Sequence, residues 1–359
     1  MNLSDLVKMT VPVHVKLERC IRSYSSKATC NQCVRFCPHN AIKLENGHVT
    51  VDMCDGCGKC IQACPHDVFE MDFPKALEKS AEGPLFLACK KENLQDLPVL
   101  SVGCLQQFTW LQLAILIRNF GKVYLFADDN SCQACEFQWF PEGQLALMER
   151  YGLKEFAERL HIIRERSELE ALLEKEIGDI NGRREYMLKQ LESVKHVAKK
   201  YTEQSLSGYL SAFNEAWKNN TVVFEKTQSH ALLLNELYED CLDTEDVPIP
   251  LKTLSAVSCR YCRACERLCP WEAIAIIEED GHAILAHHDI LCARCGLCID
   301  ICPEKGLFWD RGLTKRDITD PHWRMLMQSQ ARSCSICGET FYPTSEEQTV
   351  CAFCKHKVS

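Results

Sequence analysis

Apolar and polar residues follow one pattern in four segments of the chain, each built around a cysteine cluster that ends in Cys-Pro. From that last cysteine the segments read CPHNAIKL, CPHDVFEM, CPWEAIAI and CPEKGLFW. The first two occupy about residues 11–73 and the last two about residues 250–310. Alternation and β-branched residues predict a strand, a cysteine loop, a short helix and a second strand in each, with HVKLE, HVTVD and AILA the clearest strands. The chain therefore holds two small modules, each made of two similar halves.

The region between the modules has a different pattern. The stretches GPLFLAC, LPVLSVGC and GKVYLFADD predict three buried strands, and the apolar WLQLAILIRNF predicts a helix between the last two. This order favours a small α/β unit with a parallel sheet, to which LHII at 160–163 adds one more strand. Residues 171–201 read as a long amphipathic helix. Its alternating charges are typical of a solvated face, and the alternative is a docking arm for a partner subunit.

Cysteine usage sets the compartment that we expect. The chain has 359 residues and 25 cysteines, and it opens with MNLSDLVKMTVPVHVKLERC, which lacks the apolar core of a secretory leader. The longest apolar stretch, near 113–117, is too short to cross a bilayer. We therefore expect a reducing cytoplasm, where closely spaced cysteines indicate metal or redox sites rather than disulfides. No transmembrane segment is predicted, and peripheral membrane association stays open.

The net charge of −9 argues against a nucleic-acid-binding surface. It fits an acidic surface that docks on a basic patch of a redox partner, although mild acidity also simply favours solubility.

The second module carries two complete cysteine motifs. They read Cys259-x2-Cys262-x2-Cys265-x3-Cys269-Pro270 and Cys292-x2-Cys295-x2-Cys298-x3-Cys302-Pro303. Three closely spaced thiolates can reach three irons of one cubane, and the fourth cysteine of each motif points at the other cluster. Cluster C would use Cys259, Cys262, Cys265 and Cys302, and cluster D would use Cys292, Cys295, Cys298 and Cys269. These motifs closely resemble those of bacterial two-cluster ferredoxins.

The first module departs from this motif in one half. Its second half is intact, Cys54-x2-Cys57-x2-Cys60-x3-Cys64-Pro65, but its first half reads Cys30-x2-Cys33-x3-Cys37-Pro38, with Lys27 where a cysteine is expected. We interpret IRSYSSKAT, between Cys20 and Cys30, as a loop insertion. Cluster A would then use Cys20, Cys30, Cys33 and Cys64, and cluster B would use Cys54, Cys57, Cys60 and Cys37. The rival is a three-iron cluster without Cys20, which would then be a small buried hydrophobe.

Four cysteines of the α/β unit follow its strands. Cys89 and Cys104 end the first two strands, and Cys132-x2-Cys135 follows the third, where parallel sheets place their sites. This order resembles the delta subunit of methyl-viologen-reducing hydrogenases, which implies a flavodoxin-like domain with a [2Fe–2S] centre on Cys89, Cys104, Cys132 and Cys135. The alternatives are inert thiols or a redox-active Cys132–Cys135 dithiol. Cys241 belongs to no set.

The chain ends with two further pairs, Cys334-x2-Cys337 and Cys351-x2-Cys354, separated by thirteen residues. Four thiolates at this spacing suit tetrahedral Zn²⁺, and a rubredoxin-like single iron is the alternative.

We therefore expect an α+β protein with two ferredoxin-like 2[4Fe–4S] modules around a small flavodoxin-like α/β domain. The predicted parts are a first module (1–75), the α/β domain (80–175), a helical connector (176–242), a second module (250–312) and a zinc-ribbon-like tail (330–359).

The function that we expect is electron transfer without an active site. The chain has no GxGxxG after a strand and no GxxxxGK[ST], and no Ser/His/Asp arrangement stands out. His39 and His66, which follow Cys-Pro, are expected to be turn residues rather than catalytic acids. The chemistry would lie on a partner, such as a formate dehydrogenase-like or hydrogenase-like subunit, with an acceptor or donor protein on the other side. One alternative is a redox-sensing regulator that binds nucleic acid or protein through the tail. A radical enzyme is the other, but every CxxxC here runs into Cys-Pro.

Overall fold

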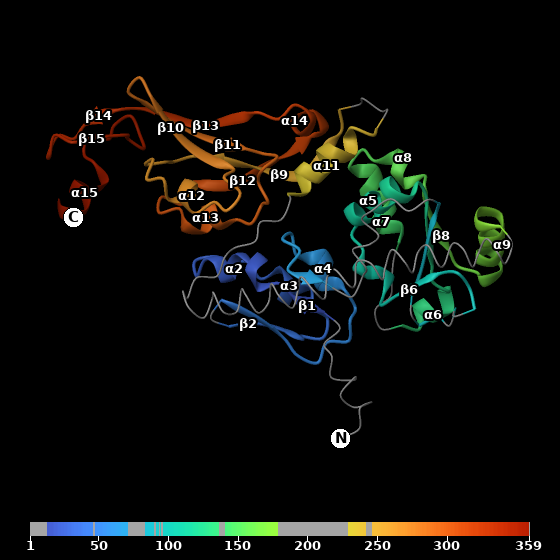
Figure 1. Ribbon diagram of the computed structural model, residues 1–359. Coiled ribbons are helices and arrows are strands. Elements are labelled where there is room, and N and C mark those ends of the chain that lie inside the picture. The colour runs from blue at the N-terminus through green and yellow to red at the C-terminus, as the bar shows by residue number, and fades with distance from the viewer. Residues whose placement is uncertain are drawn as a thin grey trace, which may run out of the picture. The chain divides into compact units, whose positions relative to one another are not determined.

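The structure is a computed structural model that describes residues 13–45, 47–70, 83–89, 91–92, 94, 96–135, 141–178, 229–241 and 246–358. The chain divides into two compact units. The first consists of Met1–Glu18, Asn31–Val223 and Asp240–Asp243, and the second of Arg19–Cys30, Phe224–Glu239 and Thr244–Ser359. Both contain helices and strands (Figure 1). Among the described residues, no helix is long and apolar enough to span a membrane.

The first cysteine module is built from two antiparallel strand pairs and two short helices. Strand β1 (His14–Val15) pairs with β4 (Phe69–Glu70), and β2 (Ile42–Glu45) pairs with β3 (His48–Val51). Helices α3 (Gln32–Phe36) and α4 (Lys59–Ala63) contact each other. The expected strand HVKLE is shorter than predicted, because after the bond from the Lys16 amide to the Val68 carbonyl the chain turns into η1 (Leu17–Arg19).

The α/β region forms a four-stranded parallel sheet in the order β6-β5-β7-β8. The strands are β5 (Leu85–Cys89), β6 (Leu100–Val102), β7 (Val123–Phe126) and β8 (Leu160–Ile163). All residues of β7 are buried, as expected for a parallel strand covered on both faces. Helix α5 (Trp110–Phe120) lies where the apolar pattern predicts it. A capping box fixes its start, since Thr109 and Gln112 each bond the other's backbone N–H.

Short helices surround this sheet: η3 (Leu105–Gln107), α6 (Asp129–Gln133), α7 (Glu142–Arg150), α8 (Lys154–Ala157) and α9 (Arg166–Ile177). Leu169 and Leu173 of α9 share a buried cluster with Phe86 and Tyr124, whose rings stack at 4.4 Å. The prediction of one continuous helix over 171–201 is wrong near its start. Helix α9 ends at Ile177, because Gly178 takes a positive φ of 85°. The rest of that prediction lies outside the described residues.

The second module contains two antiparallel sheets. Strand β9 (Pro248–Ala256) pairs with β12 (Leu307–Thr314), while β10 (Ile274–Glu279), β11 (His282–His288) and β13 (Trp323–Gln330) form a three-stranded sheet. Helices α12 (Ala264–Arg267) and α13 (Leu297–Ile301) contact each other. Helices α11 (His230–Tyr238) and α14 (Lys315–Thr319) also pack together. The sequence analysis did not foresee β13, which lies beyond the cysteine motifs.

The tail consists of a short hairpin, β14 (Arg332–Ser333) with β15 (Thr340–Phe341), followed by α15 (Ala352–Val358).

The segment between Cys20 and Cys30 is not a loop of the first module. It contains α2 (Ile21–Tyr24) and belongs to the second unit. Its apolar side chains, Ile21 and Ala28, are buried in a cluster with Trp271, Ala273, Ala293 and Leu297. The Thr29 backbone N–H and hydroxyl donate to the Asp300 carboxylate at 2.8 and 3.0 Å. The stretch IRSYSSKAT is mostly polar, but its residues Ile21 and Ala28 attach it to the second unit through apolar packing.

Substituting Gly306 by alanine is expected to destabilise the second unit. A Cβ there would collide with the Ser258 carbonyl oxygen, next to the bond from the Val257 amide to the Gly306 carbonyl. Overpacking of this kind costs ~1–3 kcal/mol, so the anaerobic urea midpoint should fall. Gly143→Ala is the control, because open space surrounds that helical glycine. Equal midpoints for the two variants would contradict the prediction.

Candidate metal centres

In the second module, one cavity is lined by the four cysteines predicted for cluster C. It measures about 360 Å³, including the part open to solvent. Cys259 and Cys262 reach it from the turn between β9 and α12, Cys265 from α12 itself, and Cys302 from the end of α13. The fold therefore brings the fourth cysteine of one motif to the first three of the other.

The cysteines predicted for cluster D are also neighbours. The charge of Cys292 contributes to the raised pKa of Cys269, Cys295 and Cys298. Cys265 also contributes to the raised pKa of Cys298, so the two predicted sets lie close together.

The backbone turns its N–H groups toward these sulfur atoms. The Tyr261 amide donates to Cys259 Sγ at 3.3 Å, and the Arg294 amide donates to Cys292 Sγ at 3.3 Å. Both donors have positive φ angles, 54° and 57°, which curl each loop around its cysteines. Such N–H···S bonds stabilise negative charge on sulfur and help set the potential of a bound cluster.

A buried histidine beside Cys292 was missed by the sequence analysis. His287 Nδ1 lies 3.1 Å from Asp289 Oδ1, and Arg324 Nε donates to Asp289 Oδ2 at 3.0 Å. Burial raises the pKa of the Cys292 thiol, but its interactions with His287 and the charge of Arg294 outweigh burial and leave the pKa lowered. His287 lies five residues before the first cysteine of its motif, where the first module has Val49. That spacing alone does not predict the contact.

In the first module, as in the second, the last cysteine of one motif lies with the first three of the other. A cavity of about 350 Å³, including its open part, is lined by the four cysteines predicted for cluster B: Cys37, Cys54, Cys57 and Cys60. His39 lines it as well and pairs with Asp55 at 2.9 Å, while His66 is buried.

The set predicted for cluster A is divided between the two units. Cys33 and Cys64 are neighbours in the first unit, since the charge of Cys33 contributes to the raised pKa of Cys64. Cys20, which is buried, and Cys30 belong to the second unit. Joint ligation by all four cysteines stays a prediction, as does its three-iron rival.

Burial of these thiols disfavours their charged form. It raises the pKa of Cys60 and Cys265 to about 12 and that of Cys259 to about 11. A coordinating cation deprotonates its thiols outright, which reverses this penalty. The chemistry of the donor sets therefore fits iron–sulfur clusters, whose irons would supply that positive charge.

The four cysteines of the α/β domain converge at the carboxyl ends of its strands. Cys89 ends β5, Cys104 immediately precedes η3, and Cys132 and Cys135 follow β7. Burial raises the pKa of Cys104 to about 11, and the charges of the other three cysteines add to it. Lys91 Nζ donates to Cys135 Sγ at 3.2 Å. The strand order places these cysteines where parallel α/β sheets bind ligands.

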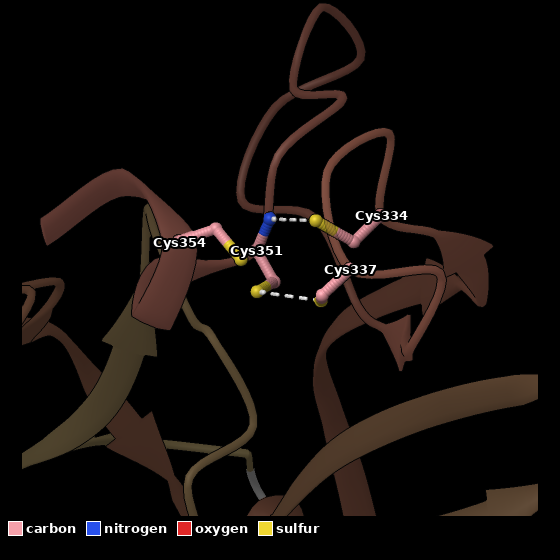
Figure 2. A group of neighbouring side chains, drawn as sticks. All are labelled: Cys334, Cys337, Cys351 and Cys354. Carbon is pink, nitrogen blue, oxygen red and sulfur yellow. Dashed lines mark hydrogen bonds between the residues drawn. The ribbon is translucent and has the colours of Figure 1, made fainter. Parts of the chain in front are cut away.

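The tail brings Cys334, Cys337, Cys351 and Cys354 together, and Figure 2 shows their side chains around one point. All four sulfur atoms lie within 4.8 Å of one another, and Cys337 Sγ lies 3.9 Å from Cys351 Sγ. A Zn–S bond of about 2.3 Å puts tetrahedral thiolates ~3.8 Å apart, so the donor set fits a single tetrahedral ion. The Cys351 backbone N–H also donates to Cys334 Sγ at 3.3 Å. Within the described residues, this is the one group of three or more donors packed so closely.

Comparisons with protein families agree with the cysteine patterns. The family model described as "LdpA Fe-S cluster-binding domain" matches residues 27–72, and the one described as "4Fe-4S dicluster domain" matches residues 258–306. Both modules are thus similar to iron–sulfur cluster-binding domains, which confirms the general prediction. The first match begins after Cys20 and leaves that residue outside it. No curated protein matches the chain.

Replacing Cys337 by serine is expected to remove the ion from the tail, because a tetrahedral thiolate site loses one of its four donors. Metal content measured on the isolated full chain should fall by the equivalent of one zinc or one iron. Cys241→Ser is the control, because Cys241 belongs to no cysteine set. An unchanged content in Cys337→Ser would contradict the prediction.

Proposed function

We propose that this protein relays single electrons between a catalytic redox subunit, formate dehydrogenase-like or hydrogenase-like, and an acceptor or donor protein. One observation carries the proposal: in both modules a cavity is lined by three cysteines of one motif and the last cysteine of the other. This is the arrangement in which two-cluster ferredoxins hold their cubanes. Each bound cluster would accept or release one electron.

The cysteine sets then hold four cubane clusters. Clusters A and B belong to the first module (1–75), and clusters C and D belong to the second (250–312). The α/β domain (80–175) would hold a [2Fe–2S] centre on Cys89, Cys104, Cys132 and Cys135. Its parallel sheet and the convergence of the four thiols support this ligand set. The tail (330–359) would hold a structural Zn²⁺, supported by the spacing of its sulfur atoms.

The protein's own groups have three tasks in this function. The thiolates hold the irons, and the backbone N–H groups of Tyr261 and Arg294 stabilise charge on the ligand sulfur atoms. Apolar side chains around cluster C, such as Leu285 and Leu307, limit the entry of water. The net charge of −9 would guide the protein to a basic patch on its redox partner.

Anaerobic isolation with bound partners, followed by metal and sulfide assays, tests the proposal. Four cubanes predict about sixteen irons, and the α/β-domain centre raises this to about eighteen. We expect near-equal acid-labile sulfide and co-purification of an oxidoreductase subunit. Colourless protein without sulfide would exclude the function, and clusters without a co-purifying redox partner would count against the relay.

His287→Leu is expected to lower the reduction potential of cluster D. The interaction of His287 with the Cys292 thiolate stabilises the more negative, reduced state. An interaction of ~1.5 kcal/mol, the scale of a charge-assisted contact, corresponds to roughly 60 mV for a one-electron couple. Redox titration monitored by EPR measures this shift. His288→Leu is the control, since that ring packs edge-on against Trp323 at 5.3 Å. Equal potentials in both variants would rule out tuning by His287.

A further inference from the structure

Helix α4 of the first module lies directly against η3 of the α/β domain, and both belong to the first unit. The Gln62 side-chain amide on α4 donates to the Phe108 carbonyl at 3.2 Å and also to the Gln106 carbonyl. Gln106 lies within η3, and Phe108 is its C-cap. One side chain therefore holds the helix of the cluster B loop to this turn of the α/β domain.

Gly58 allows the two backbones to approach. It lies between Cys57 and Cys60 and forms the N-cap of α4, with φ at 78°. A Cβ at this position would lie 2.7 Å from Gln107 Cα, closer than real Cβ atoms approach backbone. Gly58 is thus required by its left-handed backbone and also by its neighbour.

The second module provides a matched position without the neighbour. Gly296 lies between Cys295 and Cys298, forms the N-cap of α13 and has the same φ of 78°. Nothing lies within 4 Å of a Cβ built there. The close approach at Gly58 is therefore not a general demand of the cysteine motif.

The contact continues to a cysteine of the α/β domain. Cys104 is the N-cap of η3, and its carbonyl accepts from the Gln107 amide at 3.1 Å. The Gln106 backbone N–H donates to the Cys104 sulfur. Hydrogen bonds thus link Cys104 through Gln106 to Gln62, which lies on the same helix as Cys60.

We propose that Gly58 and Gln62 are positioning residues that hold the cluster B loop against the Cys104 site as one junction for electron exchange. The inference rests on the proposed function of both sites. At this junction one centre is oxidised as the other is reduced by one electron, and no bond forms or breaks. Electron transfer slows as the distance between the two centres grows. A contact that holds the two backbones together therefore fixes this distance and, with it, the transfer rate.

The test compares the anaerobic full chain with its Gly58→Ala and Gly296→Ala variants. Both substitutions impose the same left-handed strain, but only Gly58→Ala adds a collision with η3. Iron and sulfide assays report whether the sites are filled. EPR of the reduced protein reports magnetic interaction between the α/β-domain centre and its neighbour. We expect this interaction in the wild type and in Gly296→Ala, and its loss in Gly58→Ala at unchanged iron content.

Each other outcome counts against a defined part of the inference. Unchanged interaction in Gly58→Ala, or full iron content without interaction in the wild type, would overturn the junction alone. A wild type lacking the roughly two irons of the α/β-domain centre would overturn the proposed function of that site and the junction with it. If Gly58→Ala loses iron, Gln62→Leu replaces it, since this change removes both hydrogen bonds without a backbone collision. Unchanged interaction in Gln62→Leu would then overturn the proposal.

Discussion

Burial of thiols without a compensating charge is the constraint on which this structure depends. Burial raises the pKa of Cys60, Cys104 and Cys265 far above that of a free thiol, so their charged form needs a cation nearby. Small cysteine-lined modules with short strands have little core of their own. Bound metal would therefore contribute to folding as well as to function, because ligand sets of this kind rarely persist in an unfolded chain.

The sequence predicted the features that depend on local spacing. Motif spacing predicted the cysteine sets of clusters B and C. The four cysteines of each set line one cavity, three from one motif and the fourth from the other. Helix α5 and strand β8 begin and end where the apolar pattern places them. Ligation itself stays a prediction.

Features that depend on long-range packing escaped prediction. Ile21 and Ala28 lie in a stretch that is otherwise mostly polar, and only their packing against Trp271 and Leu297 shows that they are buried. The contact of His287 with Cys292 depends on how β11 leads into its cysteine loop, which no motif encodes. Gly178, by contrast, was a readable stop signal, because glycine after a helical run commonly ends the helix.

The intact motifs of the two modules also share a docking position. Two residues after the third cysteine, the first module has Gln62 and the second has Asp300. Gln62 bonds the turn that follows Cys104, and Asp300 bonds Thr29, which precedes Cys30. In each case a short helix beside a predicted cluster binds a segment that carries another predicted cysteine ligand. Since the two side chains differ in charge and partner, the shared feature is the exposed helical position itself.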